Sequence, residues 1–496
     1  MSLAGLLRAR RPAGGLRALI TCLKWPEEDG SAAGVRTLGI VRSLVAAGTR
    51  VTVTAASEAG GGGGAASEGQ ARARTALRTA GASTACLPPN DSPRLAALLG
   101  SVRPGVVVFD RLACEEMFSH GVRAWAEGAD GSGASGGFLP GGPVTVLDMQ
   151  DCHSVRAARE AATRGRSWGE GLAAALGAWP DASSTLLQRE MAAVRRSDCV
   201  WAVSDSEART AKAWAGDQCG SDHGALVSTV GFAMSNFPPP RPLEQRSRSA
   251  AMIGTFLHAP NLDAVRWAVH ELWPMVAREA RRLDPSRPAP RLAVYGSHMT
   301  DKAVARVLSG TSRSALRDAG ITLEGFAPSP DVLGEHRILF APLRFGAGVK
   351  GKVLDAWRAG TPVVTTSFGA EGICQDAPSS SGVGIPKRGG VEQARWSGFW
   401  QCDSAELLAT AAAELLTHDE MWQAHADRAQ AAARAFADPA RFEAGMEGAL
   451  QLALDPEALL ERRRSNHGQT LLWQSQLRAT SFMSRFIELK EQSRKG

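Results

Sequence analysis

Short apolar runs alternate with segments of helical length along the chain. In the first half, apolar runs lie at 18–23, 51–55, 105–109, 144–147 and 199–203. Between the first two runs, Val35, Leu38, Val41 and Val45 recur at the spacing of one helix face. Continuous β-branched runs favour strands buried on both faces, as in a parallel sheet covered by helices. The pattern therefore predicts an α/β domain in this half.

A proline-rich segment at 235–249 interrupts this pattern and is typical of a linker between domains. A second strand–helix series follows it, with predicted strands at 250–253, 292–295, 321–323, 338–341 and 362–365. We expect four parts. A leader or disordered terminus covers 1–16, a first Rossmann-like domain 17–240, a second Rossmann-like domain 250–455, and a helical tail 456–496.

Composition narrows the class of protein. The 496 residues are 44% hydrophobic and 21% charged, which excludes a largely disordered or fibrous chain. No stretch approaches the roughly 20 apolar residues that span a bilayer, so we expect no membrane span. The net charge of +6 is weak evidence for a nucleic-acid partner, and we expect none. A local basic pocket for an anionic small molecule fits the charge equally well.

Cysteine usage and the N-terminus bear on the compartment. The eight cysteines form no C-x-x-C pair and match no zinc or disulfide framework, which favours a reducing, cytoplasmic location. The first 17 residues carry Arg8, Arg10, Arg11 and Arg17 but no acidic residue. This leader is either a frayed terminus or a transit peptide, and a transit peptide would place the protein in an organelle.

The most informative segment is 338–372. A predicted strand at 338–341 leads into a loop with Gly346, Gly348 and Gly351, and a helix is predicted from about Lys352 to Arg358. Glycines let backbone N–H groups approach a ligand closely, and the N-terminus of a helix adds partial positive charge. The segment therefore predicts an anion-binding loop.

Three full positive charges lie on the same short loop. Arg344, Lys350 and Lys352 would repel one another there, and a bound diphosphate would relieve that repulsion. Asp355 lies about one turn into the predicted helix, where a carboxylate can accept hydrogen bonds from ribose hydroxyls. We interpret this combination as a site for a nucleoside diphosphate group.

Two other interpretations of the same loop stay open. Gly346, Gly348 and Gly351 also form a literal G-x-G-x-x-G, and Glu371 follows 20 residues later, as in dinucleotide-binding motifs. The motif lies late in the chain, however, and not at the first strand–helix turn of a domain. A purely structural glycine loop is the other alternative.

The motifs of the second half resemble those of a known family, the group 1 glycosyltransferases, also called glycosyltransferase family 4. They are Ile253–Asn261 (IGTFLHAPN), 294–296 (VYG), 323–325 (LEG), Ala341–Lys352 (APLRFGAGVKGK) and Gly360–Thr366 (GTPVVTT). The first half resembles the acceptor-side domain more loosely, through 31–37 (SAAGVRT) and 147–153 (LDMQDCH). Together the resemblance covers roughly residues 16–450.

The resemblance implies an α/β GT-B fold, in which two Rossmann-like domains face a central cleft and a C-terminal helix crosses back to the first domain. It also implies transfer of a sugar from a nucleotide-sugar donor with retention at the anomeric carbon. The donor would bind mostly to the second domain. The acceptor, whether glycan, lipid or small molecule, is not identified by the sequence.

The chain departs from the family pattern at two places. Many members carry two glutamates eight positions apart; Asp355 aligns with the second and Ala347 with the first. The usual Arg–Lys pair near the first strand of the second domain is also missing. We therefore expect the loop cations to supply the charge instead. The residues expected to contact the donor are Gly254, Arg344, Gly346, Gly348, Val349, Lys350, Gly351, Lys352 and Asp355.

On the acceptor side, the loop that follows the first strand contains small residues that would let a substrate lie against the backbone: Ser31, Ala32, Ala33 and Gly34. An ordinary strand–helix turn is the alternative. Asp148, Asp151 and His153 follow another strand, and His153 is a candidate to orient or polarise a hydroxyl. The alternative for these three is a polar network that merely fixes the loop.

Glu371 is a fourth candidate catalytic residue, because it follows the last motif strand and would partly replace the carboxylate missing at Ala347. No D-x-D occurs in the chain, so we expect no metal and no cofactor other than the nucleotide-sugar substrate. Fixed cations and amides would stabilise the departing diphosphate. A non-catalytic relative that binds nucleotide sugar or a protein, and a dinucleotide-dependent oxidoreductase, remain as alternative functions.

Overall fold

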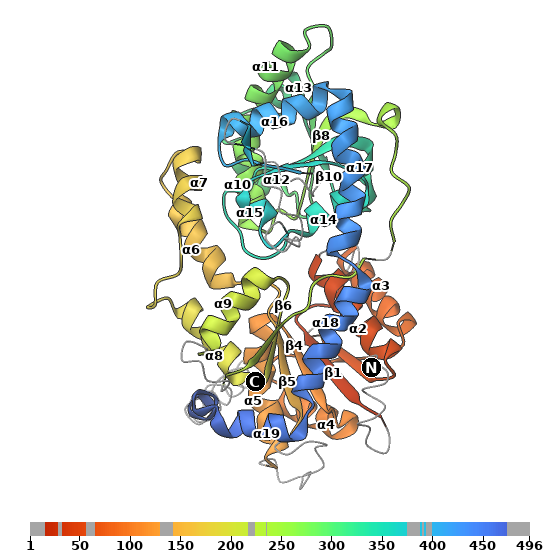
Figure 1. The fold of residues 1–496 in the computed structure, drawn as a ribbon, viewed down its shortest axis with the longest axis vertical. Coiled ribbons are helices and arrows are strands. Elements are labelled where there is room, and N and C mark those ends of the chain that lie inside the picture. Colours follow the sequence, from red (N-terminus) through yellow and green to blue (C-terminus); the bar gives the residue numbers. More distant parts are fainter. Residues whose placement is uncertain are drawn as a thin grey trace, which may run out of the picture. The chain divides into compact units, whose positions relative to one another are not determined.

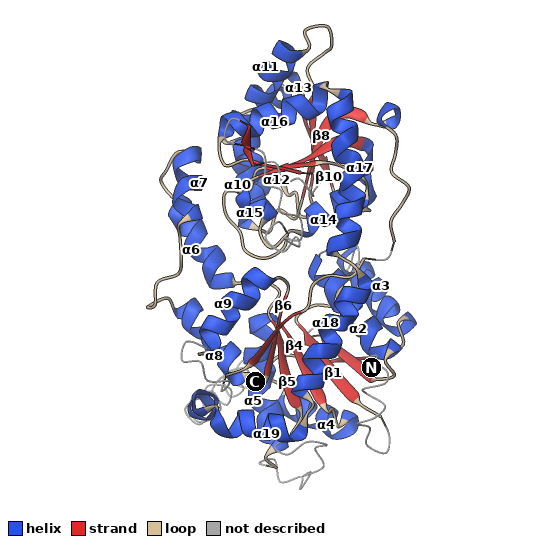
Figure 2. Ribbon diagram, in the orientation of Figure 1, coloured by secondary structure: helices blue, strands red, loops and turns tan. Residues whose placement is uncertain are grey.

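The computed structural model describes residues 15–27, 32–55, 65–128, 142–216, 224–234, 236–373, 387–388, 391–392 and 399–473. The chain divides into two compact units, each of them discontinuous in sequence (Figure 1). Unit 1 comprises 1–151, 185–233 and 439–496, and unit 2 comprises 152–184 and 234–438. Each unit is built around one sheet with helices against it (Figure 2).

Unit 1 holds a seven-stranded sheet of order β3-β2-β1-β4-β5-β6-β7, in which every neighbouring pair is parallel. Its strands are β1 Arg17–Cys22, β2 Arg50–Ala55, β3 Ser83–Cys86, β4 Val106–Asp110, β5 Val144–Asp148, β6 Cys199–Ala202 and β7 Leu226–Thr229. The order of the strands reverses between β1 and β4, which is the switch point of a doubly wound fold.

The helices of unit 1 cover both faces of this sheet. They are α2 Ala32–Ala46, α3 Ala65–Thr79, α4 Ser92–Val102, α5 Arg111–Ala126, α8 Thr185–Arg196, α9 Asp205–Ala215, α18 Pro439–Ala453 and α19 Pro456–Ser465. Alternate residues of β1 point to opposite faces. Ile20 packs in a cluster with Leu38 of α2 and Phe442 of α18. Leu19 packs with Leu99 and Phe118, from α4 and α5.

Unit 2 holds an eight-stranded sheet of order β10-β9-β8-β11-β12-β15-β14-β13. Its strands are β8 Ser247–Ile253, β9 Arg291–Tyr295, β10 Ile321–Gly325, β11 His336–Ala341, β12 Val363–Thr365, β13 Lys387–Arg388, β14 Val391–Glu392 and β15 Phe399–Gln401. The first six in this order are parallel, and the last two pairings are antiparallel. The switch point lies between β8 and β11.

The helices of unit 2 include two from the first half of the chain. They are α6 His153–Thr163, α7 Trp168–Leu176, α10 Ala259–Trp267, the π-helical η3 Ala268–Leu272, α11 Trp273–Leu283, α12 Asp301–Leu308, α13 Arg313–Asp318, α14 Gly351–Arg358, α15 Ser367–Ala370, α16 Ala405–Thr417 and α17 Asp419–Phe436, with 3-10 turns η2 Leu243–Gln245 and η4 Pro330–Glu335. Leu172 of α7 is fully buried in the same core cluster as Trp267, Trp273 and Phe340.

The observed fold confirms two parallel-sheet α/β domains, but it differs from the expected linear division in two segments. Residues 152–184 pack with the second sheet, and the described residues 439–473 pack with the first. The expected linker also ends too late, because β8 begins at Ser247. Ser249 is polar in the sequence, yet it is buried and its hydroxyl lies 2.7 Å from Nδ1 of His336.

Arg246 fixes the end of the linker to unit 2. Its guanidinium donates hydrogen bonds to the carbonyl oxygens of Arg241 (2.8 Å), His336 (3.0 Å) and Ala359 (2.9 Å), and to the hydroxyl of Thr361 (2.7 Å). None of these groups is a carboxylate. Burial therefore lowers the pKa of Arg246 to about 10, with a smaller contribution from Arg241.

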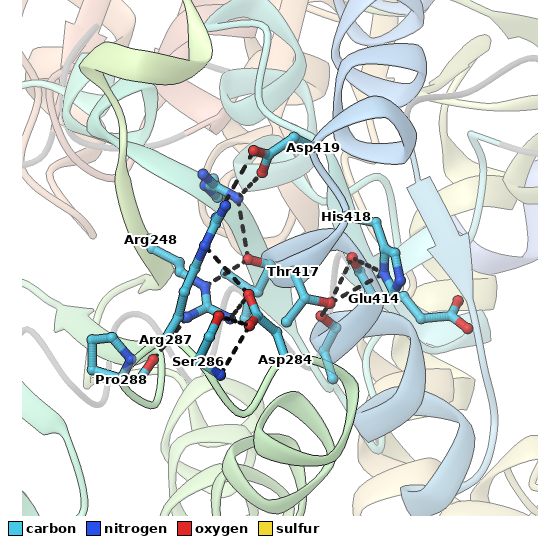
Figure 3. Close-up of polar contacts among 12 residues, drawn as sticks. Arg248, Asp284, Ser286, Arg287, Pro288, Glu414, Thr417, His418 and Asp419 are labelled. Atoms are coloured by element: carbon cyan, nitrogen blue, oxygen red, sulfur yellow. Dashed lines mark hydrogen bonds and ion pairs between the residues drawn. The ribbon is translucent and has the colours of Figure 1, made fainter.

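Hydrogen bonds and ion pairs connect the segments at the amino-terminal ends of the strands in this sheet (Figure 3). Arg248 donates to the carbonyls of Leu416 (3.0 Å) and Pro288 (2.8 Å), and Arg337 pairs with Asp419 at 2.7 Å. These contacts tie the turn between α16 and α17 to the starts of β8 and β11. They lie at the end of the strands opposite to the glycine loop, so they are structural contacts of the scaffold.

No helix among the described residues is both long and apolar enough to cross a bilayer.

Candidate functional site

The glycine loop lies at the carboxyl end of β11, beside the switch point of unit 2. In open α/β sheets, ligands bind outside the carboxyl ends of the strands at this point. The loop connects Ala341, the last residue of β11, to Gly351, the first residue of α14. Gly348 has φ +74°, a conformation that favours glycine. The predicted strand, loop and helix are all present, and the helix starts one residue earlier than predicted.

The two lysines of this loop have different surroundings. The Nζ atom of Lys350 donates to the carbonyl oxygens of Ala347, at 3.0 Å, and Gly348. The Nζ atom of Lys352 donates to Oδ1 of Asn261, 2.6 Å away. Asn261 belongs to α10, which follows β8. The contact between Lys352 and Asn261 therefore joins the two segments that flank the switch point.

The loop after β8 is shaped to accept this contact. Asn261 donates from Nδ2 to the carbonyl oxygen of Thr255, at 2.9 Å. A Cβ atom on Gly254 would lie 2.6 Å from that same amide nitrogen, so a larger residue at this position would displace the Asn261 side chain. Gly254, Asn261 and Lys352 line a small cavity of about 10 Å³, which has room for one water molecule.

The pKa of the Lys352 ammonium group is shifted from its usual value. Burial, with a smaller contribution from the neighbouring charge of Lys350, lowers the pKa of Lys352 to about 8. Both causes disfavour the ammonium form, and an anion beside Lys352 would oppose them. A buried cation of this kind, at the ligand-binding edge of a sheet, is typical of a functional site.

Asp355 of α14 also has a shifted pKa, in the opposite direction to that of Lys352. Burial raises the pKa of its carboxyl group to about 6; Arg358 opposes this effect and Asp331 adds to it. Among the described residues, none donates a hydrogen bond to this carboxylate, so only the charge of Arg358 opposes the effect of burial. A partly buried acceptor without a protein donor is available to the hydroxyl groups of a ligand.

Arg344 has protein partners of its own. Its guanidinium donates to both carboxylate oxygens of Asp263, with Nε 2.9 Å from Oδ2, and it stacks over the ring of Trp168 with its centre 4.4 Å from the ring. Only 6% of the side chain is exposed. This geometry departs from the expectation that Arg344 offers a free charge to the donor, because Asp263 neutralises it. Through these contacts, Arg344 connects the loop to Asp263 of α10 and Trp168 of α7.

Glu371 pairs with a residue that sequence reasoning did not select. Nη1 of Arg159 lies 2.8 Å from Oε1 and 2.9 Å from Oε2 of Glu371, and it also donates to the carbonyl oxygen of Gly346, at 2.6 Å. Arg159 lies on α6, about 190 positions before the loop. Its only sequence signal was its place among the charged residues that follow β5.

The Glu371 turn itself depends on a glycine. Gly369 of α15 lies against Thr365, and a Cβ atom at that position would overlap the Thr365 hydroxyl group. Val349 and Gly351 complete the loop between Gly348 and Lys352.

On the acceptor side, Asp148 is a buried ion-pair residue of unit 1. Arg36 of α2 donates to its carboxylate at 2.7 Å and also to the carbonyls of Val230 and Gly231. Gln150 donates to the same carboxylate at 3.3 Å. Asp148 is 1% exposed, so its role in this structure is to join β5, α2 and the segment after β7. The geometry agrees with the structural alternative for Asp148.

The other acceptor-side candidates are separated by the division of the chain. Asp151 is the last residue of its segment in unit 1, whereas His153 begins α6 in unit 2. Ala32, Ala33 and Gly34 open α2, and a Cβ atom on Gly34 would overlap the carbonyl oxygen of Glu27. Ser31 lies outside the described residues. A close approach of the backbone explains Gly34 without any ligand.

Within the described ranges, no three histidine, cysteine or carboxylate side chains gather so that they could hold a metal ion. The expectation of chemistry without a metal stays a prediction.

Comparison with solved structures identifies the class of fold. HepE from Anabaena, in complex with UDP-glucose, is similar with a TM-score of 0.55 at 12% identity, over 88% of this chain and 99% of that one. A glycosyltransferase from Rickettsia africae is similar with a TM-score of 0.52 at 9% identity, over 89% of this chain and 99% of that one. The protein has the GT-B glycosyltransferase fold, as predicted.

Comparison with family models gives a match to one segment of the chain. Residues 247–418 match the model of Glycosyl transferases group 1. The matched segment lies in unit 2 and includes the glycine loop, Asp355 and Glu371. The sequence has no significant match among curated proteins.

Proposed function

We propose that the protein is a glycosyltransferase that moves a sugar from a nucleoside-diphosphate sugar to an acceptor, with retention at the anomeric carbon. The observation that carries the proposal is the position of Lys350 and Lys352. Both lie at the start of α14, on a glycine loop at the switch point of a group 1 glycosyltransferase domain. Loop amides, the helix N-terminus and two ammonium groups together favour a diphosphate.

The donor is proposed to be a UDP-sugar. Support comes from HepE, whose structure holds UDP-glucose on the same fold. In our proposal, Lys350 and Lys352 bind the diphosphate, and Asp355 accepts hydrogen bonds from the ribose. Glu371 contacts the sugar, in place of the carboxylate that is missing at Ala347.

The proposed chemistry follows from these placements. When the bond from the sugar to the diphosphate breaks, negative charge grows on the leaving phosphate. Fixed ammonium groups and amides stabilise that charge without having to reorganise, and so they lower the barrier. The start of α2 and Asp151 in unit 1, and His153 in unit 2, remain candidates for contacts with the acceptor. Retention rests on the family resemblance.

Donor binding is tested by thermal shift with UDP-, GDP- and ADP-sugars. A ligand at 100 times its dissociation constant stabilises its protein by about 2.7 kcal/mol. We expect the largest shift with a UDP-sugar and its loss in the variant with both Lys350→Glu and Lys352→Glu. Lys302→Glu, an exposed lysine on α12 of the same unit, is the matched control. Equal shifts in all three proteins would refute the anion site.

Ala347 favours a second candidate function, a GT-B protein that binds nucleotide sugar without turning it over. Release of UDP from UDP-glucose, with a panel of acceptors and with water alone, separates the two. Binding without UDP release in every case supports the second candidate. Release of UDP that is lost in Glu371→Gln supports transfer.

A further inference from the structure

Helix α6 brings a cation from the first half of the chain to the glycine loop. The α6–α7 hairpin, residues 153–176, belongs to unit 2 although it precedes the linker. It lies outside the segment 247–418 that matches the family model. Its residue Arg159 contacts the loop at Gly346 and the turn at Glu371.

The guanidinium of Arg159 is held on three sides. Nη1 binds the Gly346 carbonyl oxygen at 2.6 Å and the two carboxylate oxygens of Glu371 at 2.8 and 2.9 Å. The guanidinium centre also lies 5.0 Å from the centre of the Phe368 ring. The side chains of Arg159 and Glu371 are 14% and 19% exposed. A pair this well shielded interacts more strongly than an exposed one.

A second cation competes for the same carboxylate. Nζ of Lys350 lies 3.8 Å from Oε2 of Glu371, an ion pair too long for a hydrogen bond, while Arg159 donates to both of its oxygens. Without Arg159, Glu371 would be left with Lys350 as its cation partner. A shorter, hydrogen-bonded pair of Glu371 with Lys350 would neutralise more of the charge of one of the two ammonium groups at the start of α14.

We propose that Arg159 is a positioning residue of the donor site, which holds Glu371 in hydrogen bonds of its own, keeps the ion pair of Glu371 with Lys350 long, and so leaves more of the Lys350 charge for the diphosphate. The same contacts fix the Glu371 carboxylate and the Gly346 carbonyl in one orientation. This inference rests on the proposed function. It assigns a role in donor binding to α6, a helix from the first half of the chain.

The test measures UDP affinity by titration calorimetry in the full-length protein. Arg159→Met frees Glu371 to pair with Lys350, so we expect UDP affinity to fall by about tenfold, the size of one charge-assisted hydrogen bond. Adding Glu371→Gln to that variant removes the competing carboxylate, and UDP affinity should recover to within about twofold to threefold of wild type. Release of UDP from UDP-glucose should stay low, because Glu371 is absent.

A purely structural role for Arg159 predicts the opposite pattern, because a second substitution in a damaged loop would not restore affinity. Arg164→Met is the matched control: Arg164 follows the same helix, its side chain is 74% exposed, and it forms an ion pair with Glu160 of that helix. Arg159→Lys serves if the methionine variant does not fold; it keeps a charge on a single nitrogen, and because Nη1 alone makes the contacts of Arg159 with Glu371, it should give a smaller loss.

The outcomes separate this inference from the proposed function. If wild type binds UDP and Arg159→Met binds it equally well, the inference is overturned alone. If the double variant does not recover UDP affinity, the inference is overturned as well. If wild type binds neither UDP nor UDP-glucose, the proposed function fails and takes the inference with it.

Discussion

Asp355 offers the sharpest quantitative test of the site, through Asp355→Asn. Burial raises the pKa of this carboxyl group to about 6, against about 3.9 for an aspartate in an unfolded chain. The folded protein therefore binds the proton more tightly than the unfolded chain does. The stabilisation is complete below about pH 4 and is lost as the pH rises through about 6. The full difference amounts to about 3 kcal/mol.

The asparagine variant cannot titrate, so its stability lacks this contribution at every pH. Between pH 5 and pH 8, wild type should lose about 1.4 kcal/mol relative to Asp355→Asn. Unit 2 has about 240 residues, for which 1 kcal/mol shifts the melting temperature by roughly 2–4 °C. The melting temperature of the variant minus that of wild type should therefore rise by about 3–6 °C over this range.

Differential scanning calorimetry of both proteins at pH 5, 6, 7 and 8 measures this difference. Asp318→Asn, which changes an exposed carboxylate on α13, is the control and should show a constant difference. The same Asp355→Asn variant should bind UDP several-fold more weakly, because an amide oxygen is a weaker acceptor than a carboxylate for ribose hydroxyls. A constant difference in melting temperature for Asp355→Asn would refute the burial argument.

Three further predictions concern buried charges. Arg246→Met leaves several buried acceptors without a donor, and should lower the free energy of unfolding by about 2–4 kcal/mol in calorimetry or denaturant titration; an unchanged transition contradicts this. Asp148→Asn leaves Arg36 buried without its carboxylate and should cost about 3–5 kcal/mol, so any loss of activity should track loss of folded protein in circular dichroism. UDP affinity should fall by up to about tenfold between pH 8 and pH 9 as Lys352 loses its proton, and calorimetry with Lys352→Gln should show no such fall.

Much of the fold could be predicted because the central strands are continuous apolar runs. The predicted strands at 144–147 and 292–295 differ from β5 and β9 by one residue each. The edge strands β3 and β7 were missed, since both are only partly buried and contain several polar residues. A short edge strand has too little apolar surface to leave a periodic signal.

The glycine loop could be predicted in place because its signal is local: glycines, cations and a helix start within one short segment. The residues that contact this loop from other parts of the chain could not be predicted. Arg159 and Trp168 contact the loop from a distant stretch of sequence, and a helical pattern does not say which sheet a helix will cover. Arg344 was therefore expected to be free, although Asp263 and Trp168 occupy its guanidinium.

The interleaved sequence of the two units sets an order for their completion during translation. Residues 152–184 leave the ribosome before the rest of unit 2, and about 250 further residues separate them from the end of α17. At roughly 5–20 residues per second, the nascent α6–α7 hairpin waits about 13–50 s for the last of its own helices. Unit 1 in turn waits for α18 and α19, which are synthesised later still. All of unit 2 is therefore synthesised before the last segment of unit 1, and unit 1 is the later of the two to be complete.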